Sequence, residues 1–145
     1  MTVRRLLMMI AVLAVVGMVD SAIALKAHYA HDKSSFCDIN ETLNCDIVNR
    51  SQFAVFMGIP VALIGLAGYG ALLGLATLRR DHEQTPLWLL VGATTGLGFA
   101  LYLTYIEKYI LGVYCILCLF SLAVIALITV LSSTVFVQSR RYEEG

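Results

Sequence analysis

Residues 113–137 read VYCILCLFSLAVIALITVLSSTVFV and contain no charged side chain. A helix that rises about 1.5 Å per residue needs roughly 20 apolar residues to cross a hydrocarbon core about 30 Å thick. Backbone amide and carbonyl groups need hydrogen-bond partners in lipid, and a helix supplies those partners internally. This segment therefore predicts a transmembrane helix.

Three more apolar stretches of similar length precede it, at approximately residues 6–25, 54–77 and 86–106. Hydrophobic residues make up 59% of the chain and charged residues 14%, whereas a soluble domain is about half apolar and about a quarter charged. We expect an all-α membrane protein, a four-transmembrane-helix bundle forming a single domain over residues 1–145. Pro60 is expected to kink or delay the start of the second helix.

The first stretch also has features of a secretory signal peptide. Arg4 and Arg5 precede the apolar run, and Ala-Ile-Ala at 22–24 matches a small-residue cleavage site. We favour a helix that stays in the protein, because the apolar run continues to Leu25. The net charge of zero argues against nucleic-acid binding, which needs a basic surface.

Basic residues at the ends of the apolar stretches predict the orientation. Three arginine pairs flank the N-terminus, the second connection and the C-terminus: Arg4-Arg5, Arg79-Arg80 and Arg140-Arg141. An even number of helices places these pairs on one side, and basic flanks tend to stay in the cytoplasm. We therefore expect both termini in the cytoplasm and the polar loop 26–53 as an extracytoplasmic cap between helices one and two.

All four cysteines fall on the predicted extracytoplasmic side. Cys37 and Cys45 lie in the loop 26–53, whereas Cys115 and Cys118 open the fourth helix at its outer end. Disulfides persist in oxidising compartments, so an even number of cysteines on that side favours disulfide chemistry. The cysteine pattern predicts an extracytoplasmic redox site.

Cys115 and Cys118 form a C-x-x-C at a helix start, where both sulfurs face one side and free N–H groups favour a thiolate. Exchange with the loop pair would make a relay, in which a thiolate attacks a disulfide. The loop pair can reach soluble thiols, while the helix pair lies at the depth of a lipid-soluble quinone. Two alternatives remain, a zinc site made by all four cysteines and two purely structural disulfides.

Other residues in the apolar stretches have two interpretations each. Asp20 is the one carboxylate inside these stretches. It is either a proton relay or, as the simpler interpretation, a partly hydrated residue near the outer interface. Tyr102, Tyr105 and Tyr109 lie near the outer end of the third stretch, where aromatic belts are found. Tyr102 and Tyr105 are also candidates for the wall of a quinone site.

The ordered set of motifs resembles the vitamin K epoxide reductase family, including its bacterial homologues that drive disulfide formation. The motifs in chain order are Phe36-Cys37-Asp38, Cys45, Ser51 six residues later, Gly58-Ile59-Pro60 opening helix two, and Cys115-Ile116-Leu117-Cys118 opening helix four. The resemblance spans nearly the whole chain, and the ordered set is more specific than a single C-x-x-C.

The resemblance implies a role for each residue of the predicted site. The four helices would surround the quinone, with Cys118 facing it and Cys115 exchanging disulfides with Cys45. Cys37 would meet the partner protein, and Ser51 would support the loop pair. As an alternative, Ser51 caps a short helix. The acceptor would be a quinone of the menaquinone, ubiquinone or vitamin K type, and no metal is expected.

Two departures from the family pattern refine this expectation. Vertebrate members carry a tyrosine four residues after the C-x-x-C, where this chain has Leu122. That difference favours a quinone over an epoxide as the substrate. Many bacterial members have a fused thioredoxin-like domain, whereas this chain ends soon after helix four. We therefore expect a separate thioredoxin-fold thiol protein as partner, and a bacterial inner (plasma) membrane as location.

Three rivals to this function remain. An epoxide reductase would use the same relay with thiols as the reductant, and a non-catalytic protein would use the cysteines as a zinc or disulfide staple. Another family of four-helix disulfide-bond oxidases places its C-x-x-C in the first outer loop. The order in this chain is reversed, which disfavours that family.

Overall fold

The computed structural model describes residues 2–29, 55–56, 58–78, 83–112 and 116–144, and the structural statements below concern these residues. Four long helices dominate this part of the chain. The elements in order are α1 (Val3–Tyr29), β1 (Val55–Phe56), β2 (Ile59–Pro60), α3 (Val61–Thr77), α4 (Thr85–Ile106), the π-helical turn η2 (Glu107–Leu111) and α5 (Ile116–Glu144).

Three of the four helices are long and apolar enough to cross a membrane, judged by length and composition. The qualifying segments are Val3–Lys26, Thr85–Ile110 and Ile116–Arg141. Helix α3 is also apolar but has only 17 residues, which is near the lower limit of about 17 for a span. The all-helical membrane architecture that the sequence predicts is thus present.

The helix ends differ from the ends of the apolar stretches. Helix α1 extends past both ends of the predicted range 6–25, and α5 (Ile116–Glu144) continues beyond the predicted end at 137. A helix does not have to end where its apolar residues end, because arginine, glutamine and glutamate are good helix formers. Helix α4 coincides with the predicted range 86–106 to within one residue.

Pro60 delays the start of α3, so the predicted range 54–77 began too early. Pro60 is the N-cap residue of α3 and has an extended ψ of 134°. Proline has no N–H to donate within a helix and its ring clashes with the preceding turn, so it favours a position at the start of a helix over one inside it. Upstream, β1 and β2 form a short antiparallel pair in which Phe56 lies opposite Ile59. Gly58 lies between them with φ of +84°, a conformation that glycine adopts without strain.

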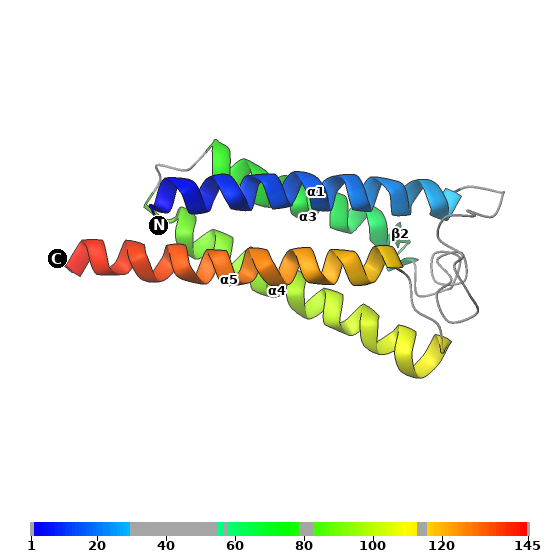
Figure 1. Ribbon diagram of the computed structural model, residues 1–145. Coiled ribbons are helices and arrows are strands. Elements are labelled where there is room, and N and C mark those ends of the chain that lie inside the picture. Colours follow the sequence, from blue (N-terminus) through cyan, green and yellow to red (C-terminus); the bar gives the residue numbers. More distant parts are fainter. Residues whose placement is uncertain (1, 30–54, 57, 79–82, 113–115, 145) are drawn as a thin grey trace.

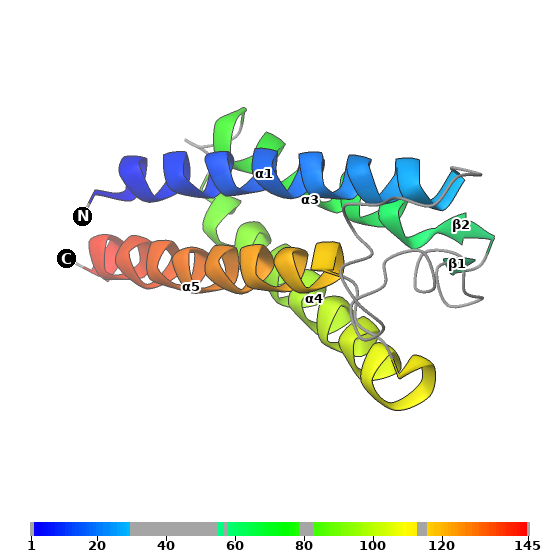
Figure 2. The ribbon, with the colours of Figure 1, turned by 45° about the vertical axis from the view of Figure 1, so that its right-hand side comes forward.

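The helices pack as a bundle with both chain ends together (Figure 1). Helices α1 and α5 run antiparallel side by side, α3 lies against α1, and α4 lies against α5 (Figures 1 and 2). We call the end that holds the termini the terminal end. We call the opposite end, where α3 and α5 begin beside the two strands, the hairpin end. Both views show α4 diverging from the other helices toward the hairpin end.

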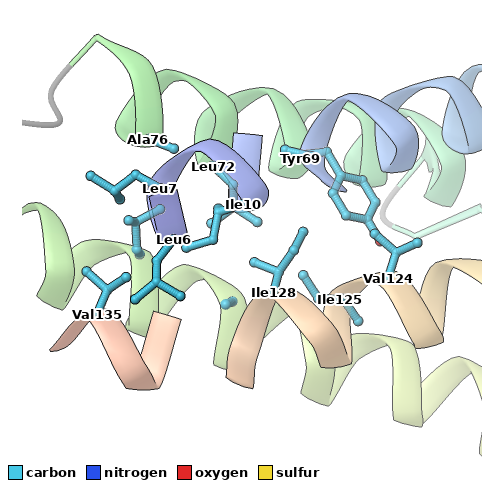
Figure 3. Close-up of a cluster of buried hydrophobic side chains, with 13 residues drawn as sticks. Leu6, Leu7, Ile10, Tyr69, Leu72, Ala76, Val124, Ile125, Ile128 and Val135 are labelled. Carbon is cyan, nitrogen blue, oxygen red and sulfur yellow. The ribbon is translucent and has the colours of Figure 1, made fainter. Parts of the chain in front are cut away.

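The apolar core lies between all four helices and is densest toward the terminal end (Figure 3). Helix α4 contributes buried Leu89 and Ala93 from its first half, and the next residue of α4 that is buried is Ile106 at its end. This change in burial agrees with the divergence of α4. The terminal half of α4 is therefore the part of this helix that packs against the apolar core.

Small residues allow the closest helix contacts. A Cβ on Gly92 would lie 3.3 Å from Leu72 of α3, and a Cβ on Gly96 would lie 3.2 Å from Ile125 of α5. A Cβ on Gly17 of α1 would overlap the ring of Tyr69. Close approach at small residues is typical of membrane helices, where dispersion contacts replace the hydrophobic effect between helices.

We predict that Gly17→Ala destabilises the bundle. The new methyl group would overlap the Tyr69 ring, and overpacking costs roughly 1–3 kcal/mol. Gly68→Ala is the matched control, because a Cβ on Gly68 has no atom within 4 Å and alanine is the better helix former. The midpoint of thermal unfolding in one detergent should fall for Gly17→Ala and hold or rise for Gly68→Ala. Equal midpoints would contradict the packing described above.

Candidate redox site

Cys118 is the predicted site cysteine that the structure describes. It is the third residue of α5 and is half-buried. The first turn of a helix has N–H groups without intrahelical partners, and its positive dipole end favours an anionic sulfur. The other predicted residues Cys37, Cys45, Ser51 and Cys115 lie outside the described residues. Their positions in the site remain predictions.

The face of α5 that holds Cys118 is turned toward α4. Leu122 follows Cys118 by four residues, and Ile125 and Thr129 continue the same face on later turns. The Thr129 hydroxyl donates to the carbonyl of Ala93 in α4 at 3.2 Å, and also to the carbonyl of Ile125 at 2.8 Å. Cys118 and half-buried Leu122 therefore share this face at the hairpin end, where α4 has diverged (Figure 2).

The predicted aromatic residues lie on the exposed side of α4. Tyr102 and Tyr105 are both more than half exposed, and they lie largely opposite Leu97 and Ala100, which pack on the core. The rings of Tyr105 and Tyr109 are 4.8 Å apart between centroids. An exposed row of tyrosines near a helix end fits an aromatic belt. A contact between Tyr102 or Tyr105 and a quinone stays a prediction.

A polar contact between α3 and α5 lies one turn from Cys118. The Tyr69 hydroxyl is 2.7 Å from the Ser121 hydroxyl oxygen and donates to the Ser121 carbonyl at 3.1 Å. Tyr69 is buried, and its ring lies over Gly17 of α1. Ser121 follows Cys118 by three residues, so their side chains are neighbours on the surface of α5. Cys118 thus lies one helical turn from a hydrogen-bonded hydroxyl pair.

Asp20 and Ser21 of α1 are buried near this hydroxyl pair. Asp20 is only 6% exposed and Ser21 5%, and both follow Gly17, which lies against the Tyr69 ring, by one helical turn. A Cβ on Gly65 of α3 would lie 2.9 Å from the Ser21 hydroxyl oxygen, so α1 and α3 approach closely here. We call Asp20, Ser21, Tyr69 and Ser121 the polar cluster.

The expectation that Asp20 is a partly hydrated residue was wrong. Buried residues recur along α1 at Ile10, Ala14, Gly17 and Ser21, and Asp20 lies on the edge of this packed face. The sequence gives the depth of a residue along a helix, but neighbouring helices decide which face is covered. Asp20 therefore lies in a helix interface.

Sequence reasoning missed Tyr69, Ser121 and Glu107. Apart from Thr77 at the end of α3, Tyr69 is the one residue of this apolar, glycine-rich helix with a polar side-chain group, which was an available signal. Glu107 begins η2 and is 1% exposed, and π-helical turns occur frequently at functional sites. No three metal-ligating side chains gather among the described residues. Because three of the four cysteines are not among them, the zinc alternative stays a prediction.

The sequence model of the vitamin K epoxide reductase family matches residues 8–133 of the chain. The matched range begins in α1 and ends in α5, so it covers every helix around Cys118. It also includes the positions of all four cysteines.

We predict that Tyr69→Phe lowers stability more than Ser121→Ala. The first change removes the interhelical hydroxyl, which is worth about 0.5–1.5 kcal/mol. The second change leaves the Ser121 carbonyl as an acceptor for Tyr69. Thermal unfolding of both variants in one detergent tests the order. A larger loss for Ser121→Ala would show that the carbonyl contact contributes little.

Proposed function

The chain belongs to the vitamin K epoxide reductase family, and from this premise we propose that it passes electrons from a thiol protein to a quinone and thereby supports disulfide formation. Members of the family are membrane oxidoreductases that use quinones and disulfides and work with thioredoxin-like partners. The observation that carries the proposal is the position of Cys118. It lies in the first turn of α5, on the face turned toward α4.

The proposed reaction proceeds through two cysteine pairs. A dithiol of a separate thioredoxin-fold partner reduces the Cys37–Cys45 disulfide, and the resulting thiols reduce the Cys115–Cys118 disulfide. Each exchange proceeds by thiolate attack and a mixed disulfide. The reduced helix pair then transfers two electrons and two protons to the quinone, and its own disulfide forms again. The net products are one partner disulfide and one quinol.

The proposed quinone position is beside Cys118, on the side of α5 toward the diverging part of α4. Leu122 would add an apolar contact one turn along, and its side chain replaces the tyrosine of vertebrate members. Tyr102 and Tyr105 would contact the quinone from α4, and Ser51 would support the loop pair. A menaquinone or ubiquinone suits this apolar location, because both partition into lipid.

We propose that all four helices cross the bacterial inner membrane with both termini in the cytoplasm. Helix α3 would be the shortest span. The positions of the chain ends support this orientation. Both termini lie at one end of the bundle, and α5, whose third residue is Cys118, begins at the other end (Figure 1). Arg4 and Arg5 begin α1, and Arg140 and Arg141 lie near the end of α5, so basic residues gather at the terminal end. The cysteine pairs would then be extracytoplasmic.

The test is anaerobic reduction of menaquinone or ubiquinone by the purified protein with a dithiol donor. We predict that Cys118→Ala lowers the rate to that of the reaction without protein, because the terminal thiol is missing. Ser133→Ala is the matched control on the same helix, since its hydroxyl bonds to the Thr129 carbonyl at 2.9 Å, far from Cys118. The control should retain the wild-type rate. Quinone absorbance in a stopped-flow cell reports both rates.

The same assay separates the rival functions. Turnover with vitamin K epoxide and none with quinones would assign the epoxide as substrate. Unchanged quinone turnover in Cys118→Ala would refute the assigned role of this thiol. Absence of turnover with every acceptor, in protein that carries stoichiometric zinc, would assign the four cysteines to a structural zinc site.

A further inference from the structure

We propose that Asp20, Tyr69 and Ser121 form a proton relay that takes up the proton released at Cys118 and returns it to the reduced quinone. This inference rests on the proposed function and adds a route for the protons. It assigns positioning and proton-transfer roles to three residues that lie outside the cysteine motifs.

The hydroxyl pair supplies the first part of the route. A separation of 2.7 Å between the Tyr69 and Ser121 hydroxyl oxygens is typical of a short O–H···O hydrogen bond. Either oxygen can be the donor, so the pair can carry a proton in both directions. Ser121 is one turn from Cys118 on α5, and Tyr69 extends the route to α3 and toward α1.

Asp20 supplies the end of the route. A carboxyl group inside an apolar bundle is costly, and such groups mark proton relays in membrane proteins. Asp20 is 6% exposed and follows Gly17 by three residues, so it lies one turn from the point where the Tyr69 ring covers α1. Ser21, the next residue, faces Gly65 of α3. The three groups of the proposed relay come from α1, α3 and α5.

The reaction releases and takes up equal numbers of protons, so the proposed relay needs no outside acid or base. Oxidation of two thiols to a disulfide breaks two S–H bonds and releases two electrons and two protons. Reduction of a quinone to a quinol accepts two electrons and forms two O–H bonds. In the relay, Ser121 accepts the Cys118 proton and passes its own to Tyr69, which passes a proton to the Asp20 carboxylate. The reverse transfer gives a proton to a quinol oxygen, so Asp20 ends unchanged.

The experiment compares Asp20→Asn, Tyr69→Phe and Asp20→Glu in quinone reduction by the purified, prereduced protein. Loss of a proton-transfer group lowers kcat by roughly 100-fold or more, and we expect this for the first two variants with KM for the quinone unchanged. Their solvent deuterium isotope effect should increase, because proton transfer then limits the rate. Asp20→Glu should restore most of the rate, since it restores a carboxyl group.

Thr129→Val is the matched structural control. It removes a hydroxyl that bonds to Ala93 across α5 and α4 at 3.2 Å, more than two turns from Cys118. If polar contacts only hold the helices together, Thr129→Val and Tyr69→Phe would change kcat and the isotope effect alike. The relay predicts that Thr129→Val affects stability and leaves both kinetic quantities at wild-type values.

The outcomes distinguish failure of the relay from failure of the proposed function. Wild-type turnover that disappears in Cys118→Ala and persists at full rate in Asp20→Asn and Tyr69→Phe would refute the relay alone. A loss confined to Glu107→Gln would also refute it and assign the proton route to η2. Absence of wild-type quinone turnover would overturn both proposals together.

Discussion

Lipid offers no hydrogen-bond partners, and the rest of this structure depends on that constraint. The long described segments satisfy their backbone groups as helices, and several hydroxyls inside them bond back to a carbonyl one turn earlier. Thr95, Thr104 and Ser133 all do so at 2.8–2.9 Å. A polar contact between two helices is therefore an exception. The exceptions described here are Thr129 with Ala93 and Tyr69 with Ser121, and the second lies one turn from Cys118 on α5.

Apolar packing and buried polar groups are distributed unevenly along the axis of the bundle. Leucine, isoleucine and valine fill the terminal half, where Gly92 and Gly96 bring α4 against α3 and α5. At the hairpin end α4 diverges, Cys118 is half-buried, and buried polar groups replace part of the apolar core (Figures 1 and 2). Among the described residues, the apolar core therefore lies mainly in the terminal half, and the buried polar groups lie nearer the hairpin end.

The helices could be predicted from the sequence, because they depend on local composition. The contacts between helices could not, because they depend on residues far apart in the chain. Uninterrupted apolar residues predicted the helices, and Pro60 predicted the late start of α3. The orientation of Asp20 into an interface depends on how α1 meets α3, which no local pattern encodes. The contact between Tyr69 and Ser121 joins residues 52 positions apart, so it follows only from the packed bundle. Cys118 became a candidate because a C-x-x-C in an apolar stretch is a local motif, and its redox role stays a prediction.

The central claim is that the cysteines exchange electrons with a quinone, and an anaerobic titration tests it most directly. The fully reduced protein is mixed with increasing quinone, and remaining thiols are counted by mass spectrometry after alkylation. The account predicts two thiols lost for each quinol formed, as a two-electron couple requires, with Cys118 in the disulfide of the first equivalent. Four unreacted thiols beside unreduced quinone would contradict it.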